Sequence, residues 1–154
     1  MPSPLRLCVR RSAARDGESL GTLVTLRLPS EVACIEEAVE LVSRHCLAGQ
    51  DATTKTRFRL QVVLSEALSN AIVRGNREDR RKWVDIRVEL GMEAIRLEVT
   101  DEGAGFDPTA VPDPIHPEQL DEANGRGLYL IRKLVDAVEF NERGNSICMI
   151  LRRP

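Results

Sequence analysis

Glu66 and Asn70 are the first residues of this chain whose types and spacing could do chemistry. They lie four residues apart in a segment with helical apolar spacing, so they share one helix face, about 6 Å apart. A carboxylate and an amide oxygen placed in this way could serve a substrate hydroxyl and a magnesium ion, because Mg²⁺ prefers hard oxygen ligands. A solvated glutamate and an asparagine at a helix end would show the same pattern, so this pair alone does not define a site.

Two glycine-containing segments could complete such a site. Residues 101–105 (DEGAG) follow a predicted strand, where an aspartate could accept a hydrogen bond from an exocyclic amine and glycines would let a ligand approach the backbone. Residues 124–127 (NGRG) open a predicted helix, and a helix N-terminus favours an anion such as phosphate. Taken singly, the first segment could also be an ordinary turn and the second a hinge of a loop.

Two common nucleotide-binding motifs are excluded. The chain contains no GxxxxGK[ST] sequence, and no glycine is followed by lysine. The dinucleotide fingerprint requires a third glycine at the positions that Pro108 and Leu130 occupy. The P-loop and Rossmann interpretations are therefore rejected.

Together, the three segments resemble the motifs of the GHKL ATPase and kinase superfamily. Residues 65–71 (SEALSNA) resemble its N-box, residues 101–108 (DEGAGFDP) its first glycine box, and residues 125–131 (GRGLYLI) its second. Within the superfamily, these three motif sequences are similar to those of the bacterial anti-sigma-factor serine kinases. The resemblance covers about residues 20–151, which is nearly the whole chain.

The resemblance implies a site for ATP and Mg²⁺. Glu66 would be the general base toward a serine hydroxyl, and Asn70 would bind the Mg²⁺ that bridges the ATP phosphates. Asp101 would accept the adenine amino group, and residues 106–124 would form the ATP lid. The other implied ATP-binding residues are Gly103 and Gly105, which leave room for the base and the lid, and Gly125, Arg126 and Gly127, which serve the phosphates.

Elementary chemistry agrees with these implied roles, because phosphoryl transfer needs positioning and charge neutralisation more than covalent help. Two positions depart from the family pattern. Arg74 stands where the family often has histidine; it could contact phosphate or pair with an acid, but it stays protonated and cannot act as a base. Near the last strand, Asn145 follows Gly144 where the family often has Gly-Thr, which weakens one expected phosphate or base contact.

The elements that must position these residues follow from the hydrophobic periodicity. Strands are predicted at residues 20–28, 83–90, 95–99, 138–142 and 146–152, and helices at about 32–46, 53–74 and 127–137. Ser30 is predicted to cap the first helix, Gly49 to end it, and Gly75-Asn76 to stop the second. Four prolines exclude regular structure from residues 106–124. This order predicts an α+β two-layer sandwich, a Bergerat-type fold whose mixed, mostly antiparallel sheet carries helices on one face.

One ATPase and kinase domain is expected at residues 20–152, after an N-terminal tail at residues 1–19. That tail could instead form an extra edge strand, because Leu5, Leu7 and Val9 alternate with polar residues. The four cysteines form no CxxC pair, so metal binding is not expected; Cys34 and Cys46 fit the apolar face of a helix. This cysteine usage and the lack of a secretory signal indicate the cytoplasm.

The composition of the chain argues against two other classes of protein, nucleic-acid binders and membrane proteins. The net charge of −2 and the 3% aromatic content argue against a dedicated nucleic-acid binder, and no apolar run approaches the length of a membrane span.

The leading hypothesis is a protein-serine kinase that binds a sigma factor and phosphorylates a small STAS-type anti-sigma antagonist; a homodimer is plausible. A nucleotide-gated binding module with little catalysis is the second hypothesis. A histidine autokinase is the third, with only His45 and His116 to accept phosphate.

Overall fold

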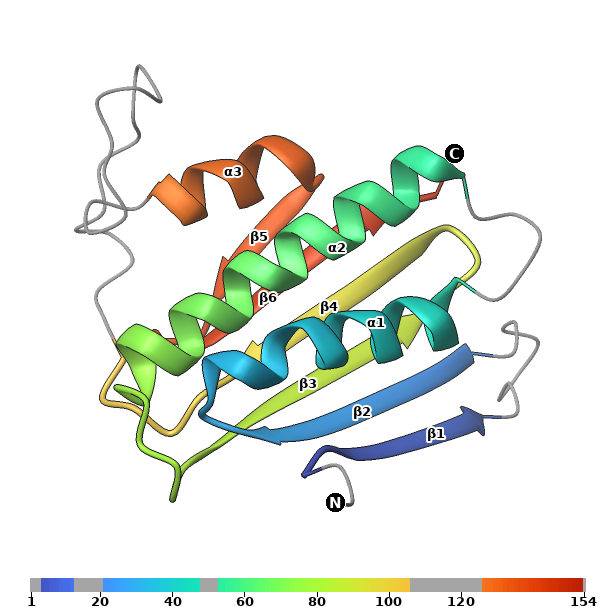
Figure 1. Ribbon diagram of the computed structural model, residues 1–154. Coiled ribbons are helices and arrows are strands. Elements are labelled where there is room, and N and C mark those ends of the chain that lie inside the picture. The colour runs from blue at the N-terminus through green and yellow to red at the C-terminus, as the bar shows by residue number, and fades with distance from the viewer. Residues whose placement is uncertain (1–3, 13–20, 48–52, 106–125, 154) are drawn as a thin grey trace.

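The computed structural model describes residues 4–12, 21–47, 53–105 and 126–153. They form a six-stranded sheet of order β1-β2-β3-β4-β6-β5, and α1, α2 and α3 cover one of its faces (Figure 1). The strands are β1 (Arg6–Ser12), β2 (Gly21–Pro29), β3 (Trp83–Leu90), β4 (Ala94–Thr100), β5 (Ala137–Phe140) and β6 (Ser146–Arg152). The helical segments are η1 (Val32–Cys34), α1 (Ile35–Cys46), α2 (Thr54–Ser69), η2 (Asn70–Gly75) and α3 (Arg126–Leu134).

The predicted two-layer sandwich is confirmed. All strand pairings among the described residues are antiparallel. The predicted lid at residues 106–124, Gly125 and the predicted helix end at Gly49 lie outside the described residues. No helix in the described part of the chain is long and apolar enough to cross a membrane.

Alternating side chains create the two faces of the sheet. In β3, Val84, Ile86 and Val88 are buried, whereas Asp85 and Arg87 between them are exposed. The β4 residues opposite the buried β3 positions are themselves buried. Full burial of one aliphatic side chain contributes about 1.5–3 kcal/mol, so a shift of one residue in this register would expose the whole apolar set.

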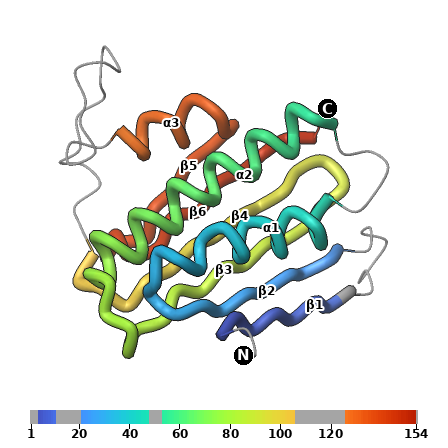
Figure 2. The backbone as a smooth tube through the Cα atoms, in the orientation of Figure 1, coloured from blue at the N-terminus to red at the C-terminus, as the bar shows by residue number. Residues whose placement is uncertain are grey.

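The core lies between the sheet and two helices, α1 and α2, which lie side by side across it (Figure 2). Val42 of α1 and Leu60, Leu64 and Leu68 of α2 are completely buried. Their spacing of four residues places them on one side of α2, which leaves the other side for polar residues. Cys34 and Cys46 are buried as predicted, and burial raises the pKa of the Cys46 thiol to about 12.

Helix boundaries differ from the sequence expectation in two places. The prediction that Ser30 caps the first helix is wrong: its hydroxyl donates to the carbonyl of Lys82 at 2.9 Å, because η1 separates Ser30 from α1. The second helix begins as expected, with the Thr53 hydroxyl accepting from the amide of Thr56 at 3.1 Å. Its last turn, predicted as α-helix, is a π-helix from Asn70 to Gly75.

The N-terminal residues supply the edge of the sheet. The sequence left open whether this segment is a tail or an edge strand. Residues 6–12 form the edge strand, β1, which pairs antiparallel with β2. Leu7 and Val9 lie opposite Leu26 and Val24, so they continue the apolar face of the sheet to its border. They remain partly exposed there, at 37% and 44%.

Candidate active site

The change from α-helix to π-helix occurs within the predicted N-box. Glu66 lies in the last turn of α2, and Asn70 is the first residue of η2. The amide of Asn70 faces the carbonyls of both Glu66 and Ala67, as expected where the helical winding changes. Single turns of π-helix occur frequently at functional sites. Glu66 and Asn70 are each half-buried, so their polar groups remain accessible at the edge of the core.

Gly127 brings the second glycine box against this pair. A Cβ atom on Gly127 would lie 2.6 Å from Glu66 Oε2 and 3.6 Å from Asn70 Nδ2. Only glycine leaves this space free, so the first turn of α3 approaches the carboxylate directly. Figure 1 shows the end of α2 and the start of α3 at the same end of the molecule.

This juxtaposition has a definite electrostatic consequence. The N-terminus of α3 favours an anion, whereas the adjacent Glu66 carboxylate repels one. A divalent cation between the carboxylate and a phosphate would remove that conflict. Mg²⁺ commonly takes one or two protein oxygens and completes its shell with phosphate oxygens and water, and the side chains of Glu66 and Asn70 include oxygens of this type. The donor set therefore fits a magnesium nucleotide.

The first glycine box packs against the other end of the N-box. A Cβ atom on Gly75 would overlap the carboxylate of Asp101, and one on Gly103 would overlap the carbonyl of Gly75. These contacts join η2 directly to the segment after β4. Gly75, which the sequence predicts only as a helix stop, thus joins the candidate site; its place four residues after the N-box was the available signal.

Asp101 is held by its backbone and by one carboxylate oxygen. Its Oδ1 accepts the amide of Gly103 at 2.7 Å. Its own amide donates to the carbonyl of Asn145 at 2.9 Å, and Asn145 Nδ2 donates back to the Asp101 carbonyl at 2.8 Å. Partial burial raises the pKa of the Asp101 carboxyl, opposed by the Gly103 amide and by the charges of Arg143 and Lys82. A half-buried acceptor of this kind could receive the amino group of a base.

Asn145 therefore has a role that the sequence did not suggest. The departure from Gly-Thr at this position was expected to weaken a ligand contact. In the structure, the amide nitrogen of Asn145 holds Asp101, and its Oδ1 accepts from Asn141 Nδ2 at 2.6 Å. Both polar atoms of the side chain are used within the protein. Asn145 thus positions Asp101 from the turn just before β6.

Gly105 ends the described part of the first glycine box in a conformation suited to glycine. Its φ is +81°, and a Cβ atom there would overlap the carbonyl of Arg143. Arg74 and Arg126 are exposed at the end of η2 and at the start of α3. The structure thus brings Glu66, Asn70 and Gly127 together, and joins Asp101 and Gly103 to them through Gly75.

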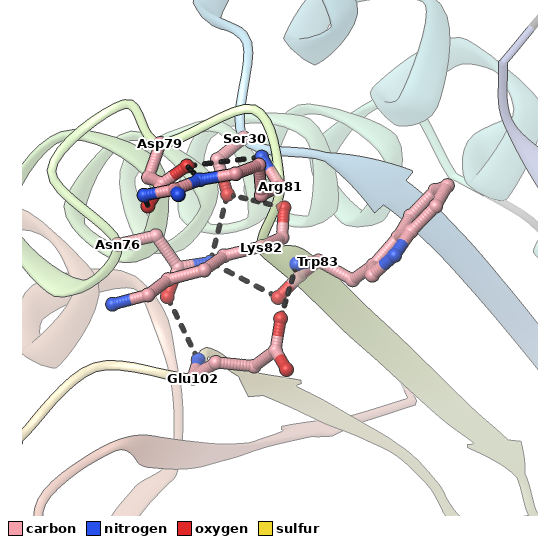
Figure 3. A network of polar contacts seen from close by, with 7 residues as sticks. All are labelled: Ser30, Asn76, Asp79, Arg81, Lys82, Trp83 and Glu102. Atoms are coloured by element: carbon pink, nitrogen blue, oxygen red, sulfur yellow. Dashed lines mark hydrogen bonds and ion pairs between the residues drawn. The ribbon is translucent and has the colours of Figure 1, made fainter.

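A buried asparagine anchors the first glycine box (Figure 3). Asn76 is 1% exposed; its Nδ2 donates to Ser30 Oγ at 2.8 Å and to the Trp83 carbonyl at 3.0 Å. Its Oδ1 accepts the amide of Glu102 at 2.8 Å. Glu102 Oε2 in turn accepts the amide of Trp83 at 2.5 Å. One side chain thus links the ends of β2 and η2, the start of β3 and the residue after Asp101.

The family model that describes the histidine kinase-like ATPase domain matches residues 28–151. The chain belongs to this family. Its six-stranded antiparallel sheet with helices on one face agrees with the Bergerat-type fold that the resemblance implied. Membership in this ATPase family implies ATP binding, which agrees with the chemistry of the donor set.

Several relatives of this histidine kinase-like domain are named as kinases or anti-sigma factors. The serine-protein kinase RsbW of Bacillus subtilis is 33% identical over 58% of this chain and 61% of its own length. The anti-sigma F factor of Clostridium beijerinckii is 28% identical over 70% of this chain and 77% of its own length. The serine/threonine-protein kinase BtrW of Bordetella bronchiseptica is 27% identical over 59% and 66%, respectively. The chain thus spans less than two thirds of two of these three relatives.

Proposed function

We propose that this domain is an ATP-dependent protein-serine kinase that acts as an anti-sigma factor. It would bind a sigma factor and phosphorylate a serine on a small STAS-type antagonist of that binding. The observation that carries this proposal is the Glu66 carboxylate beside Asn70, directly at the N-terminus of α3. In a kinase, this carboxylate would serve as the base toward the serine hydroxyl.

Each motif residue has a task in this proposal. Glu66 orients the serine hydroxyl and accepts its proton, as a general base within hydrogen-bond reach must do. Asn70 holds Mg²⁺, which when bound neutralises the charge of the transferred phosphoryl group. Asp101 accepts the adenine amino group, and Gly103 and Gly105 let its segment pack closely against the carbonyls of Gly75 and Arg143. Gly127, together with Gly125 and Arg126, faces the phosphates.

The partners follow from the names of the relatives. A relative named anti-sigma F factor supports a sigma factor as the protein that is held, and relatives named serine-protein kinases support a serine on a second protein as the phosphate acceptor. Such partners place the chain in the cytoplasm, with no direct contact to DNA. We include a homodimer in this proposal, because β1 leaves part of the apolar face of the sheet uncovered.

The test is phosphorylation of the antagonist. The protein is mixed with Mg-ATP and candidate STAS-type antagonists, and phosphoserine is located by mass spectrometry. Glu66→Gln is the matched variant, since it preserves the shape of the side chain and removes the base. Transfer by the wild type and loss of transfer by a variant that still binds ATP would support the proposal. Bound ATP with no phosphoserine on any antagonist would contradict it.

A nucleotide-gated binding module without catalysis is the second candidate. It is favoured by Asn145, whose two polar side-chain atoms are used inside the protein. The same variant distinguishes the two functions. If Glu66→Gln leaves nucleotide-dependent exchange of partners intact and the wild type transfers no phosphate, the binding module is the better description.

A further inference from the structure

Arg59 lies on α2, the helix that also carries Glu66. It contacts the C-terminal end of α3, whereas Glu66 lies beside the N-terminal end. It precedes Glu66 by seven residues, which is about two helical turns, so both side chains project toward the same neighbour. That neighbour is α3, which packs along α2 in the opposite direction (Figure 1). The Arg59 side chain is 17% exposed, unlike an ordinary surface arginine.

Arg59 holds the C-terminal end of α3 by two groups. Its Nε donates to the carbonyl of Leu134, the last residue of α3, at 2.5 Å. Its Nη2 lies 3.2 Å from Asp136 Oδ2. The carbonyls at a helix C-terminus lack partners within the helix and carry partial negative charge. The guanidinium therefore satisfies one such carbonyl and also complements the end of the dipole.

Asp136 extends this contact to the sheet. Its Oδ2 accepts the amide of Arg152 in β6 at 2.7 Å, and its own amide donates to the carbonyl of Ile150 at 2.8 Å. The Arg152 amide is the largest influence lowering the pKa of the Asp136 carboxyl, and Arg59 adds to it. Through Asp136, Arg59 thus connects α2, the end of α3 and β6.

Both ends of α3 lie against side chains of α2. Gly127 contacts Glu66 at one end, and Leu134 contacts Arg59 at the other. Arg59 and Glu66 are seven residues apart on α2, and Gly127 and Leu134 are seven residues apart on α3. The hydrogen bond and ion pair of Arg59 fix the C-terminal end of α3. A tilt of this short helix would change how closely Gly127 approaches Glu66.

We propose that Arg59 is a positioning residue for the second glycine box. By holding the C-terminal end of α3, it keeps the phosphate-facing N-terminus of that helix in place against Glu66 and Asn70. This inference rests on the proposed nucleotide-binding function of the site. It assigns a specific effect to a residue about two helical turns from that site: loss of Arg59 weakens ATP binding without touching the nucleotide.

Nucleotide affinity tests the inference with a matched control on the same helix. Arg59→Ala, Asp136→Asn and Arg57→Ala are titrated with a fluorescent ATP analogue in Mg²⁺. Arg57 is an exposed arginine of α2 and serves as the control. We expect Arg59→Ala to weaken binding about tenfold, the scale of one charged hydrogen bond, and Asp136→Asn to weaken it less, because Arg59 retains the Leu134 carbonyl. Arg57→Ala should stay within about twofold of the wild type.

Hydrogen exchange separates positioning from a general loss of stability. Each variant is compared with the wild type, without nucleotide, in peptides from α3 and from α1. Faster exchange confined to α3 supports the inference, whereas equal acceleration in both helices shows a merely structural role and overturns it. If Arg59→Ala does not fold, the Asp136→Asn variant, which keeps the shape of the side chain, carries both measurements.

The outcomes for the inference and for the proposed function are distinct. Wild-type protein that does not bind the ATP analogue would contradict the proposed function, and the inference with it. Wild-type protein that binds, together with an Arg59→Ala variant of unchanged affinity, would overturn the inference alone.

Discussion

Replacing Gly127 by alanine tests the contact on which the proposed function depends. The new Cβ atom would lie 2.6 Å from Glu66 Oε2, whereas ordinary contacts begin at 3.4 Å. The carboxylate must therefore retreat by about 0.8 Å, or α3 must move away by a similar distance. Because the carboxylate is the end of a flexible side chain, this adjustment costs little folding free energy.

The same small movement should have a large effect on catalysis. A misplacement of about 1 Å can cost about 100-fold in rate, so we expect phosphoryl transfer to fall by between about tenfold and 100-fold. Stability should move the other way. Gly127 lies within α3 and has no positive φ, and alanine is more favourable than glycine in a helix by up to about 1 kcal/mol. The variant should unfold no more easily than the wild type.

The assay combines transfer of phosphate to the antagonist with urea unfolding of the same preparation. Gly91→Ala is the matched control, because Gly91 lies in the β3–β4 turn, at the opposite end of β4 from Asp101. The control should keep its transfer rate. A Gly127→Ala variant with a transfer rate within twofold of the wild type would refute the reasoning, and so would a loss of transfer that merely followed a loss of stability.

Two further predictions concern Asp101 and Asn76. Burial raises the folded-state pKa of the Asp101 carboxyl, so its contribution to stability is present at low pH and is lost as the pH rises through that pKa. Asp101→Asn should therefore flatten the pH dependence of unfolding above the ordinary pKa of an aspartate, and it should weaken nucleotide binding. A steeper pH dependence in the variant would show the sign to be wrong. Asn76→Ala should lower the unfolding free energy by about 2–4 kcal/mol, because it removes three hydrogen bonds that one buried side chain makes to three segments. Urea unfolding would contradict this if the loss were below about 1 kcal/mol.

The elements and their order could be predicted from the chain because the signals are local. Alternation in β3 and β4 and helical spacing in α1 and α2 reflect side chains that face one core. The prediction failed where a tertiary contact replaced a local one. Ser30 is a good capping residue by type, but its hydroxyl is used by Asn76 and Lys82, which come much later in the chain.

The site could be predicted only in part. Glu66, Asn70 and Asp101 could be proposed as site residues because their types and motifs are visible in the sequence. Gly75, Asn76 and Asn145 were missed as site residues, because their roles depend on contacts with segments that are distant along the chain. The π-helical turn at Asn70 was also missed, since the apolar spacing there continues that of an α-helix.

The sequence by itself determined the class of this protein: an α+β domain with an N-box and two glycine boxes in a fixed order. Local chemistry is sufficient for that, because periodicity and motif spacing are properties of short segments. Only the tertiary structure decided that Gly127 touches Glu66, that Gly75 touches Asp101, and that Arg59 holds the far end of α3. Those contacts join residues from different elements, and the packing of the helices on the sheet brings them together.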